Sequence, residues 1–396
     1  MNASRKPIRS RLVFMIVSIV CLAPFAMGAL VEQEKGSEDS LFKQLSVLSE
    51  VLTLIQRTYV DETSIRGLLD GALEGATDAL DPLSTFVPAE FRESYAQTVA
   101  VGSSRCGLIV ARDRGVTYVV AVADGSPGQG AEIERGDVIA SINGLSTRNM
   151  ALWRLQGILA DAPGTQLDLE LLRSGRSQSK ELVLSSYANP EPALSRSSDI
   201  AVLRVSRVNE ESVGLVRDLL QSIQGEDHLI VDLRGVAGGD SNAAYRLGAL
   251  FASGRLGTLS ARDEELRAFD NDLPALWQGE AAVVVDGGTQ GAAEILAAIL
   301  KQSLSATLVG QPTFGLAGRS GTIDLPSGGQ VVTTDALFSG PDGEPIDQHM
   351  RPDELVRESL RSLEDESAEL VDLMLERAVE VLVREEQADQ VEQEVA

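Results

Sequence analysis

Cysteine and histidine are scarce in this sequence of 396 residues, which contains two of each. Cys21 lies in an N-terminal apolar stretch, so the rest of the chain has a single thiol, Cys106. One thiol can build neither a disulfide framework nor a cysteine zinc site. His228 and His349 are far apart in the sequence, which argues against a metal pair and against a histidine-based catalytic triad. We therefore expect no metal site.

Basic residues are also under-represented, since 34 Lys and Arg stand against 59 Asp and Glu and the net charge is -25. Such a surface repels phosphate backbones, so nucleic acid is not an expected partner. Apolar residues make up 43% of the chain, which is enough for sizeable cores. At roughly 150 residues per domain, the length predicts two or three domains.

The N-terminus has the pattern of a targeting segment. Arg5, Lys6, Arg9 and Arg11 precede an uncharged apolar run over residues 12–30 that ends in small residues. This order is typical of a secretory signal, and the run is also long enough to span a bilayer uncleaved. We interpret residues 1–30 as a signal peptide or a membrane anchor, and we expect an exported protein that is periplasmic or anchored at the cell envelope.

The rest of the chain divides by its hydrophobic period. Residues 41–100 have helical spacing, 101–188 read mainly as strands, and 196–356 alternate strand and helix, which predicts a layered α/β domain with a largely parallel sheet. Residues 357–396 form an acidic tail with an apolar helical stripe, either docked on the core or used for dimerisation. Two Gly-rich turns, 234–240 and 286–291, follow strand ends, where α/β sheets place their sites. Neither turn has a phosphate-binding pattern, so we expect no nucleotide and no cofactor.

Residues 101–188 resemble a PDZ domain. Gly136-Asp137-Val138-Ile139 followed by Ile142-Asn143-Gly144 is the combination that carries the resemblance. A PDZ domain binds an extended C-terminal peptide as an added strand and holds its carboxylate with backbone N–H groups of one loop. The resemblance places that loop at Arg105, Cys106, Gly107 and Leu108, although the family more often has glycine where Arg105 stands. A small β-rich domain without a peptide groove is the alternative.

The order of the parts resembles the C-terminal processing (tail-specific) serine peptidase family. The matching stretches follow one another through most of the chain: 81–86, 231–234 with Gly238-Gly239, 287–288 with 293–295, 308–315, 325–329 and 351–353. The resemblance implies a PDZ domain plus a layered α/β protease core, with a helical N-terminal region. It also implies a serine nucleophile with a lysine as general base.

The functional positions of that family are all changed in this sequence. The family's turn is similar to Ser-Ala-Ser-Ala-Ser-Glu, and here residues 289–294 read Thr-Gln-Gly-Ala-Ala-Glu, which puts Gly291 at the nucleophile position. The lysine of the Phe-Gly-Lys-Gly stretch falls on Leu316, and the glutamine that often supports it falls on Ser320. The spacing between the first two positions keeps the family's register, so a slipped alignment does not explain the loss.

Three functions remain open. We expect a member without peptidase activity that binds polypeptide C-terminal tails or a partner peptidase, with backbone donors of Gly238, Gly239, Gly291 and Ala292 surviving as a vestigial cleft unless Leu316 seals it. The alternative is an active serine-type tail-specific endopeptidase with non-standard residues, for which Thr289 and His349 are the candidates. A third reading is an oligomerisation scaffold with no peptide site. The sequence also leaves open a homo-oligomer.

Overall fold

The computed structural model describes residues 42–101, 105–148, 150–187, 189–262, 264–315, 317–346, 348–356 and 372–395. The expected signal or anchor at 1–30, the base position Leu316 and most of the first part of the acidic tail lie outside these residues. The chain forms two compact units, Met1–Leu73 and Glu74–Ala396. Among the described residues, no helix combines the length and the apolar character needed to cross a membrane.

The predicted N-terminal helical region is helical. Residues 42–58 form one helix, and α2 (Ile65–Asp78) follows it. A turn at Asp81 then stops the helical run, because the Asp81 carboxylate accepts the N–H groups of Leu83 and Ser84 at 2.8 Å each. The chain continues into the short strand β1 (Thr85–Val87), the turn η1 (Ala89–Phe91) and the helix α3 (Arg92–Val101).

The PDZ-like region has the predicted order of strand, strand, short helix, strand, turn, helix, strand. Its sheet runs β2-β3-β4-β6-β7, with β5 paired to β4. Asn143 and Gly144 both have positive φ in the tight turn between β4 and β5, as the Asn-Gly pair predicts. The elements are β2 (Leu108–Asp113), β3 (Val116–Val122), α4 (Pro127–Gly130), β4 (Val138–Ile142), β5 (Leu145–Ser146), α5 (Leu152–Leu159), β6 (Gln166–Arg173) and β7 (Arg176–Val183).

The α/β region contains the predicted largely parallel sheet, ordered β17-β14-β13-β10-β9-β8. The strands from β17 to β9 pair in parallel, and only the edge strand β8 is antiparallel. Its elements are β8 (Ala193–Ser197), β9 (Ile200–Arg204), α6 (Glu210–Ser222), β10 (His228–Asp232), α7 (Ser241–Gly248), β13 (Glu280–Val285), α8 (Ala292–Leu304), β14 (Thr307–Gly310), β17 (Glu354–Leu355) and α9 (Leu373–Val395).

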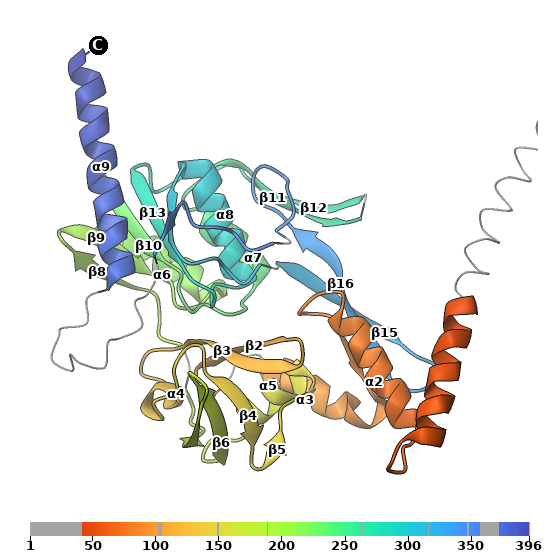
Figure 1. Cartoon of the computed structure of the whole chain (residues 1–396). Helices are drawn as coiled ribbons and strands as arrows, with labels where there is room; N and C mark the ends of the chain where they lie inside the picture. The colour runs from red at the N-terminus through yellow and green to blue at the C-terminus, as the bar shows by residue number, and fades with distance from the viewer. Residues whose placement is uncertain are drawn as a thin grey trace, which may run out of the picture. The chain divides into compact units, whose positions relative to one another are not determined.

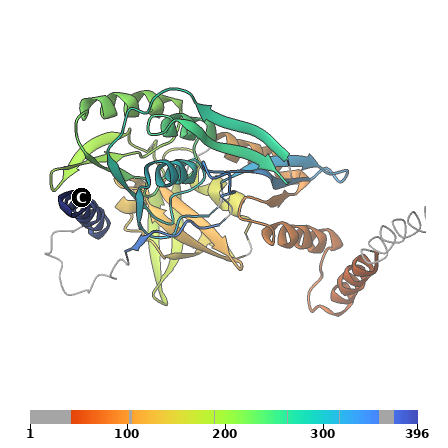
Figure 2. The same cartoon turned by 90° about the horizontal axis from the view of Figure 1, so that it is seen from above.

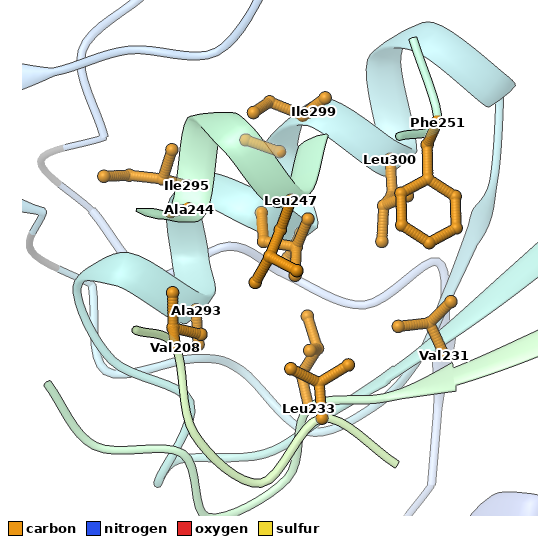
Figure 3. Packing of buried hydrophobic residues seen from close by; sticks show 14 of the residues in the cluster. Val208, Val231, Leu233, Ala244, Leu247, Phe251, Ala293, Ile295, Ile299 and Leu300 are labelled. Carbon is orange, nitrogen blue, oxygen red and sulfur yellow. The ribbon is translucent and has the colours of Figure 1, made fainter. Parts of the chain in front are cut away.

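Both faces of this sheet are covered by helices. Side chains such as Val231 and Leu233 pack with α7 and α8 on one face, as Figure 3 shows. On the other face, Ile230 and Val284 pack against Met374, Ala378, Val381 and Leu382 of α9. Figure 1 shows α9 and α8 on opposite sides of β10 and β13. The tail helix is therefore docked on the core, which is one of its two predicted arrangements.

A third sheet was not anticipated from the sequence pattern. It runs β1-β16-β11-β12, and β15 pairs with the other edge of β16. Its strands β11 (Gly254–Ala261), β12 (Glu264–Asn271), β15 (Gly318–Asp324) and β16 (Gln330–Phe338) form two antiparallel hairpins, which project from the layered core in Figure 2. Because β1 and β15 both pair with β16, this sheet contains the strand between α2 and α3 and also the strand that follows the base position Leu316.

Candidate functional site: the turn at Gly291 and the loop at Gly107

The two Gly-rich turns meet because they follow neighbouring parallel strands, β10 and β13. Asp286 joins them, since its Oδ1 accepts the N–H of Gly235 at 2.9 Å and that of Gly288 at 3.0 Å. The N–H of Gln290 also donates to the carbonyl of Val236 at 3.0 Å. These bonds fix the loop after β10 against the turn that leads into α8.

The predicted vestigial cleft residues lie at this junction. Gly238 and Gly239 are exposed and have φ values of 72° and 112°, which glycine adopts readily. A Cβ added to Gly239 would lie 3.2 Å from the Cβ of Ala292, so the loop touches the first turn of α8. Ala292 itself is only 2% exposed, and it therefore contributes backbone here and no open wall.

Gly291 occupies the sharp turn before α8 with φ 53° and ψ -107°. This combination lies outside the regions that residues with a Cβ favour. A Cβ added to Gly291 would meet no atom within 4 Å, so the space beyond this position is open. The turn thus presents a backbone bend and free space, without a side-chain oxygen, at the position where the resemblance places a nucleophile.

Glu294 holds this bend and was not singled out from the sequence. Its carboxylate is fully buried, and Oε2 accepts the N–H of Gly291 at 3.0 Å. Its Oε1 accepts the hydroxyl of Thr313 at 2.5 Å and the N–H of Gly315 at 2.7 Å. One carboxylate therefore connects the nucleophile turn with the stretch that precedes the base position. The only signal in the sequence is an acid three residues after a helix start, the spacing of a capping box.

The candidate replacement residues lie around this frame. Thr289 is fully buried, its hydroxyl donates to the carbonyl of Leu233 at 3.0 Å, and it accepts the N–H of Asp286 at the same distance. His349 is exposed, and its Nδ1 lies 2.6 Å from the carbonyl of Thr313. Ser320 lies on the exposed strand β15, opposite Thr334 of β16. His349 therefore contacts a backbone carbonyl, whereas the Thr289 hydroxyl is bonded to Leu233 and Asp286.

A charged cluster lies beside the same loop. Asp232 is 4% exposed and binds Arg204 at 2.7 Å and Arg234 at 2.7 Å, and Arg234 binds Asp372 before α9 at 2.8 Å. Burial by itself raises the pKa of the Asp232 carboxyl, but hydrogen bonds from Arg234 and the charges of both arginines outweigh burial and lower it. The cluster therefore ties the loop after β10 to the docked tail helix.

The loop predicted to hold a peptide carboxylate is tightly constrained. Gly107 has φ 69°, and a Cβ at this position would collide with the side chain of Ser126. The carbonyls of Cys106 and Gly107 accept N–H groups of Gly128 and Ala123 at 2.8 Å each. Cys106 and Leu108 are buried, and Arg105 is half-buried. The four residues lie at the start of β2, which is an edge strand of its sheet.

The PDZ-like sheet also contacts the turn before Gly291. A Cβ added to Gly288 would lie 2.9 Å from the Cβ of Ala121 and 3.1 Å from the Cδ1 of Ile109, and one added to Gly287 would lie 3.2 Å from Val120. The two glycines therefore let β2 and β3 approach the turn closely.

Comparison with known proteins agrees with this arrangement. Residues 199–356 match the model of peptidase family S41, and residues 118–173 match that of the PDZ domain. The carboxy-terminal processing protease CtpA of Bacillus subtilis is 27% identical over 326 residues, covering 79% of this chain and 68% of that protein. The carboxy-terminal-processing protease of Bartonella bacilliformis is 24% identical over 322 residues, covering 78% of this chain and 74% of that protein.

A solved structure shares the fold. The photosystem II D1 C-terminal processing protease superposes with a TM-score of 0.62 at 21% identity, covering 78% of this chain and 91% of that one. The predicted fold class is confirmed, as is the resemblance drawn from the sequence. The chain therefore contains a region that matches peptidase family S41 and a region that matches the PDZ domain, and it is similar to carboxy-terminal processing proteases.

Proposed function

We propose that this protein binds polypeptide C-terminal tails at the cell envelope without hydrolysing them. The observation that carries the proposal is the turn at Gly291, which has the bend, the open space and the Glu294 hydrogen bond but no side-chain oxygen that could act as a nucleophile. A partner peptidase is the alternative binding partner. The basic and apolar pattern of residues 1–30 supports the location.

The chemistry near the turn supports a loss of hydrolysis. A serine hydroxyl attacks only when a base takes its proton, and neither Gly291 nor Leu316 provides either group. Thr289 is a poor substitute, since its hydroxyl is buried and already donates to a carbonyl. Ser320 lies on the exposed strand β15 opposite Thr334, whose side chain is not a base. The alternative of an active endopeptidase needs an accessible hydroxyl beside a base. Thr289 lies 3.3 Å from the Asp286 carboxylate and Thr313 lies 2.5 Å from that of Glu294, but both hydroxyls belong to buried residues.

The backbone near the turn supports binding. Gly238 and Gly239 are exposed next to the start of α8, where the positive end of the helix dipole suits a peptide carbonyl. The PDZ loop offers backbone N–H groups to a terminal carboxylate, and the free edge of β2 can accept an added strand. An extended peptide with a free, small apolar C-terminus fits both features.

The decisive experiment restores the missing side chains. The wild-type chain is incubated with a protein that bears an unstructured apolar C-terminus, and we expect no cleavage and no labelling by a serine-directed phosphonate. The double variant Gly291→Ser with Leu316→Lys should recover measurable cleavage, whereas either single variant should not, because the two groups act as a unit. Cleavage by the wild-type chain, or stoichiometric labelling of Thr289, would contradict the proposal.

A second pair of variants tests whether the vestigial cleft takes part in binding. Gly291→Trp places bulk in the open space, and Gly291→Ala carries the same backbone penalty without the bulk. We expect the tryptophan variant alone to weaken binding of a long tail peptide. Equal binding by both variants would mean that Leu316 seals the cleft and that only the PDZ domain binds.

A further inference from the structure

The edge strand β2, where a peptide strand would add, packs against α5, and the apolar residues between the two elements are buried. Leu108 and Val110 of β2 are 3% and 5% exposed, and Leu155 and Leu159 of α5 are fully buried in the same apolar cluster. A peptide that adds to β2 must insert a side chain between these residues. Because interiors are close-packed, that insertion requires α5 to move away from β2.

The helix α3 lies behind α5 and opposes this movement. Trp153 and Gly157 are one helical turn apart on α5, on the side opposite Leu155 and Leu159. The Trp153 ring is 8% exposed and packs edge-on against Tyr95 of α3 at a centroid distance of 5.6 Å. Phe91 lies 6.1 Å from the same ring, and the Arg154 guanidinium stacks over Phe91 at 5.0 Å.

The contact between α3 and α5 is close, and one buried group in it is destabilising. A Cβ added to Gly157 would lie 2.6 Å from the Oγ1 of Thr98, so the glycine lets α3 approach α5 closely at this point. The buried indole N–H of Trp153 has no hydrogen-bond partner in the part of the chain that the structure describes. A buried donor without a partner destabilises the docked state, and undocking would relieve that penalty.

We propose that α3 is a latch on the PDZ groove, and that a C-terminal peptide binds only after the cluster of Phe91, Tyr95 and Trp153 releases α5. This inference rests on the proposed binding of polypeptide tails and adds its regulation. The apparent affinity for a peptide is then the intrinsic affinity reduced by the fraction of molecules in which the latch is open. Weakening the latch tightens binding, and locking it prevents binding.

A disulfide between α3 and α5 would hold the latch closed, and reducing that disulfide provides the control. The Cβ of Thr98 lies 3.8 Å from the position of a Cβ on residue 157, which is the mean Cβ–Cβ distance in disulfides. The full chain with Thr98→Cys and Gly157→Cys is prepared in a Cys21→Ser background, and Cys106 stays buried. The probe is a fluorescein-labelled decapeptide with a free carboxylate that ends in Val-Ala, and binding is measured by anisotropy.

We expect the oxidised double variant to bind at least tenfold more weakly than the same protein after reduction. Equal affinity before and after reduction would overturn the latch while leaving tail binding intact. If neither the wild-type chain nor the reduced variant binds the peptide, then the proposed function fails and the latch fails with it.

A second variant opens the latch without a disulfide. Tyr95→Leu removes the edge-on contact with Trp153, and aromatic pairs of this kind are strong enough for about a three- to tenfold gain in affinity. Tyr59→Leu is the matched control, because Tyr59 is 59% exposed and lies outside the cluster. Unchanged or weaker binding by Tyr95→Leu, in protein whose unfolding transition is still cooperative, would also overturn the proposal.

Discussion

Replacing Gly291 by alanine tests the geometry of the nucleophile turn directly. The backbone there has φ 53° and ψ -107°, and an added Cβ would meet no atom within 4 Å. The substitution therefore has a backbone penalty but no steric clash, which predicts a loss of about 1–2 kcal/mol in the free energy of unfolding. For a core of this size, the melting temperature should fall by roughly 2–8 °C.

The matched control is Gly214→Ala. Gly214 is exposed in the middle of α6, has an ordinary helical backbone, and also has open space around its Cβ position. The same change should raise stability there by roughly 0.5–1 kcal/mol, because alanine loses less conformational entropy than glycine in a helix. Thermal unfolding followed by circular dichroism measures both variants. If Gly291→Ala is as stable as the wild-type chain, then the turn does not have this bend and the preserved nucleophile frame is refuted.

The remaining predictions concern the two ends of the site. Gly107→Ala should abolish the preference for a free-carboxylate peptide over its amidated form, because any side chain at φ 69° strikes Ser126; calorimetry with both peptides measures this, and an unchanged preference would rule the loop out. The lowered pKa of Asp232 adds stability above its unfolded pKa of about 3.9, which is lost as the pH falls through the still lower native value. Asp232→Asn should therefore destabilise the chain at pH 7 and flatten the acid side of its stability curve, and an acid slope equal to that of the wild-type chain would contradict the role given to this carboxyl.

The elements that were predicted well are those with a strong local pattern. The strands β9, β10 and β13 are continuous apolar runs next to helices with a clear 3.6-residue period, so a parallel sheet with covered faces follows from the sequence. The Asn143-Gly144 turn was also predicted from the sequence, because only a few residue types favour two positive φ values in succession. The hairpins β11–β12 and β15–β16 were missed because their strands are mixed in polarity. Their pairing partners, such as β1, also lie far away in the sequence.

The sequence predicted the positions of the site residues but not their contacts. The positions Gly291 and Ser320 were assigned by matching the sequence to the family's motif. The structure also brings the turns around Gly239 and Ala292 together, because they follow the neighbouring parallel strands β10 and β13. The role of Glu294 could not be predicted, because its carboxylate accepts hydrogen bonds from residues up to 21 positions away. The burial of Thr289 was equally hidden, and this weakens it as a nucleophile in a way that no sequence pattern reveals.

Mass spectrometry of a tail peptide recovered from its complex with the protein separates binding from cleavage in one measurement. The full chain is incubated with an equimolar decapeptide that ends in Val-Ala, separated from free peptide, and denatured to release what it holds. We predict that the free-carboxylate peptide is recovered at its intact mass, that its amidated form is not retained, and that the protein carries no covalent adduct. A shortened peptide, or an acyl adduct on any hydroxyl of the protein, would contradict the proposal that this protein binds tails without cutting them.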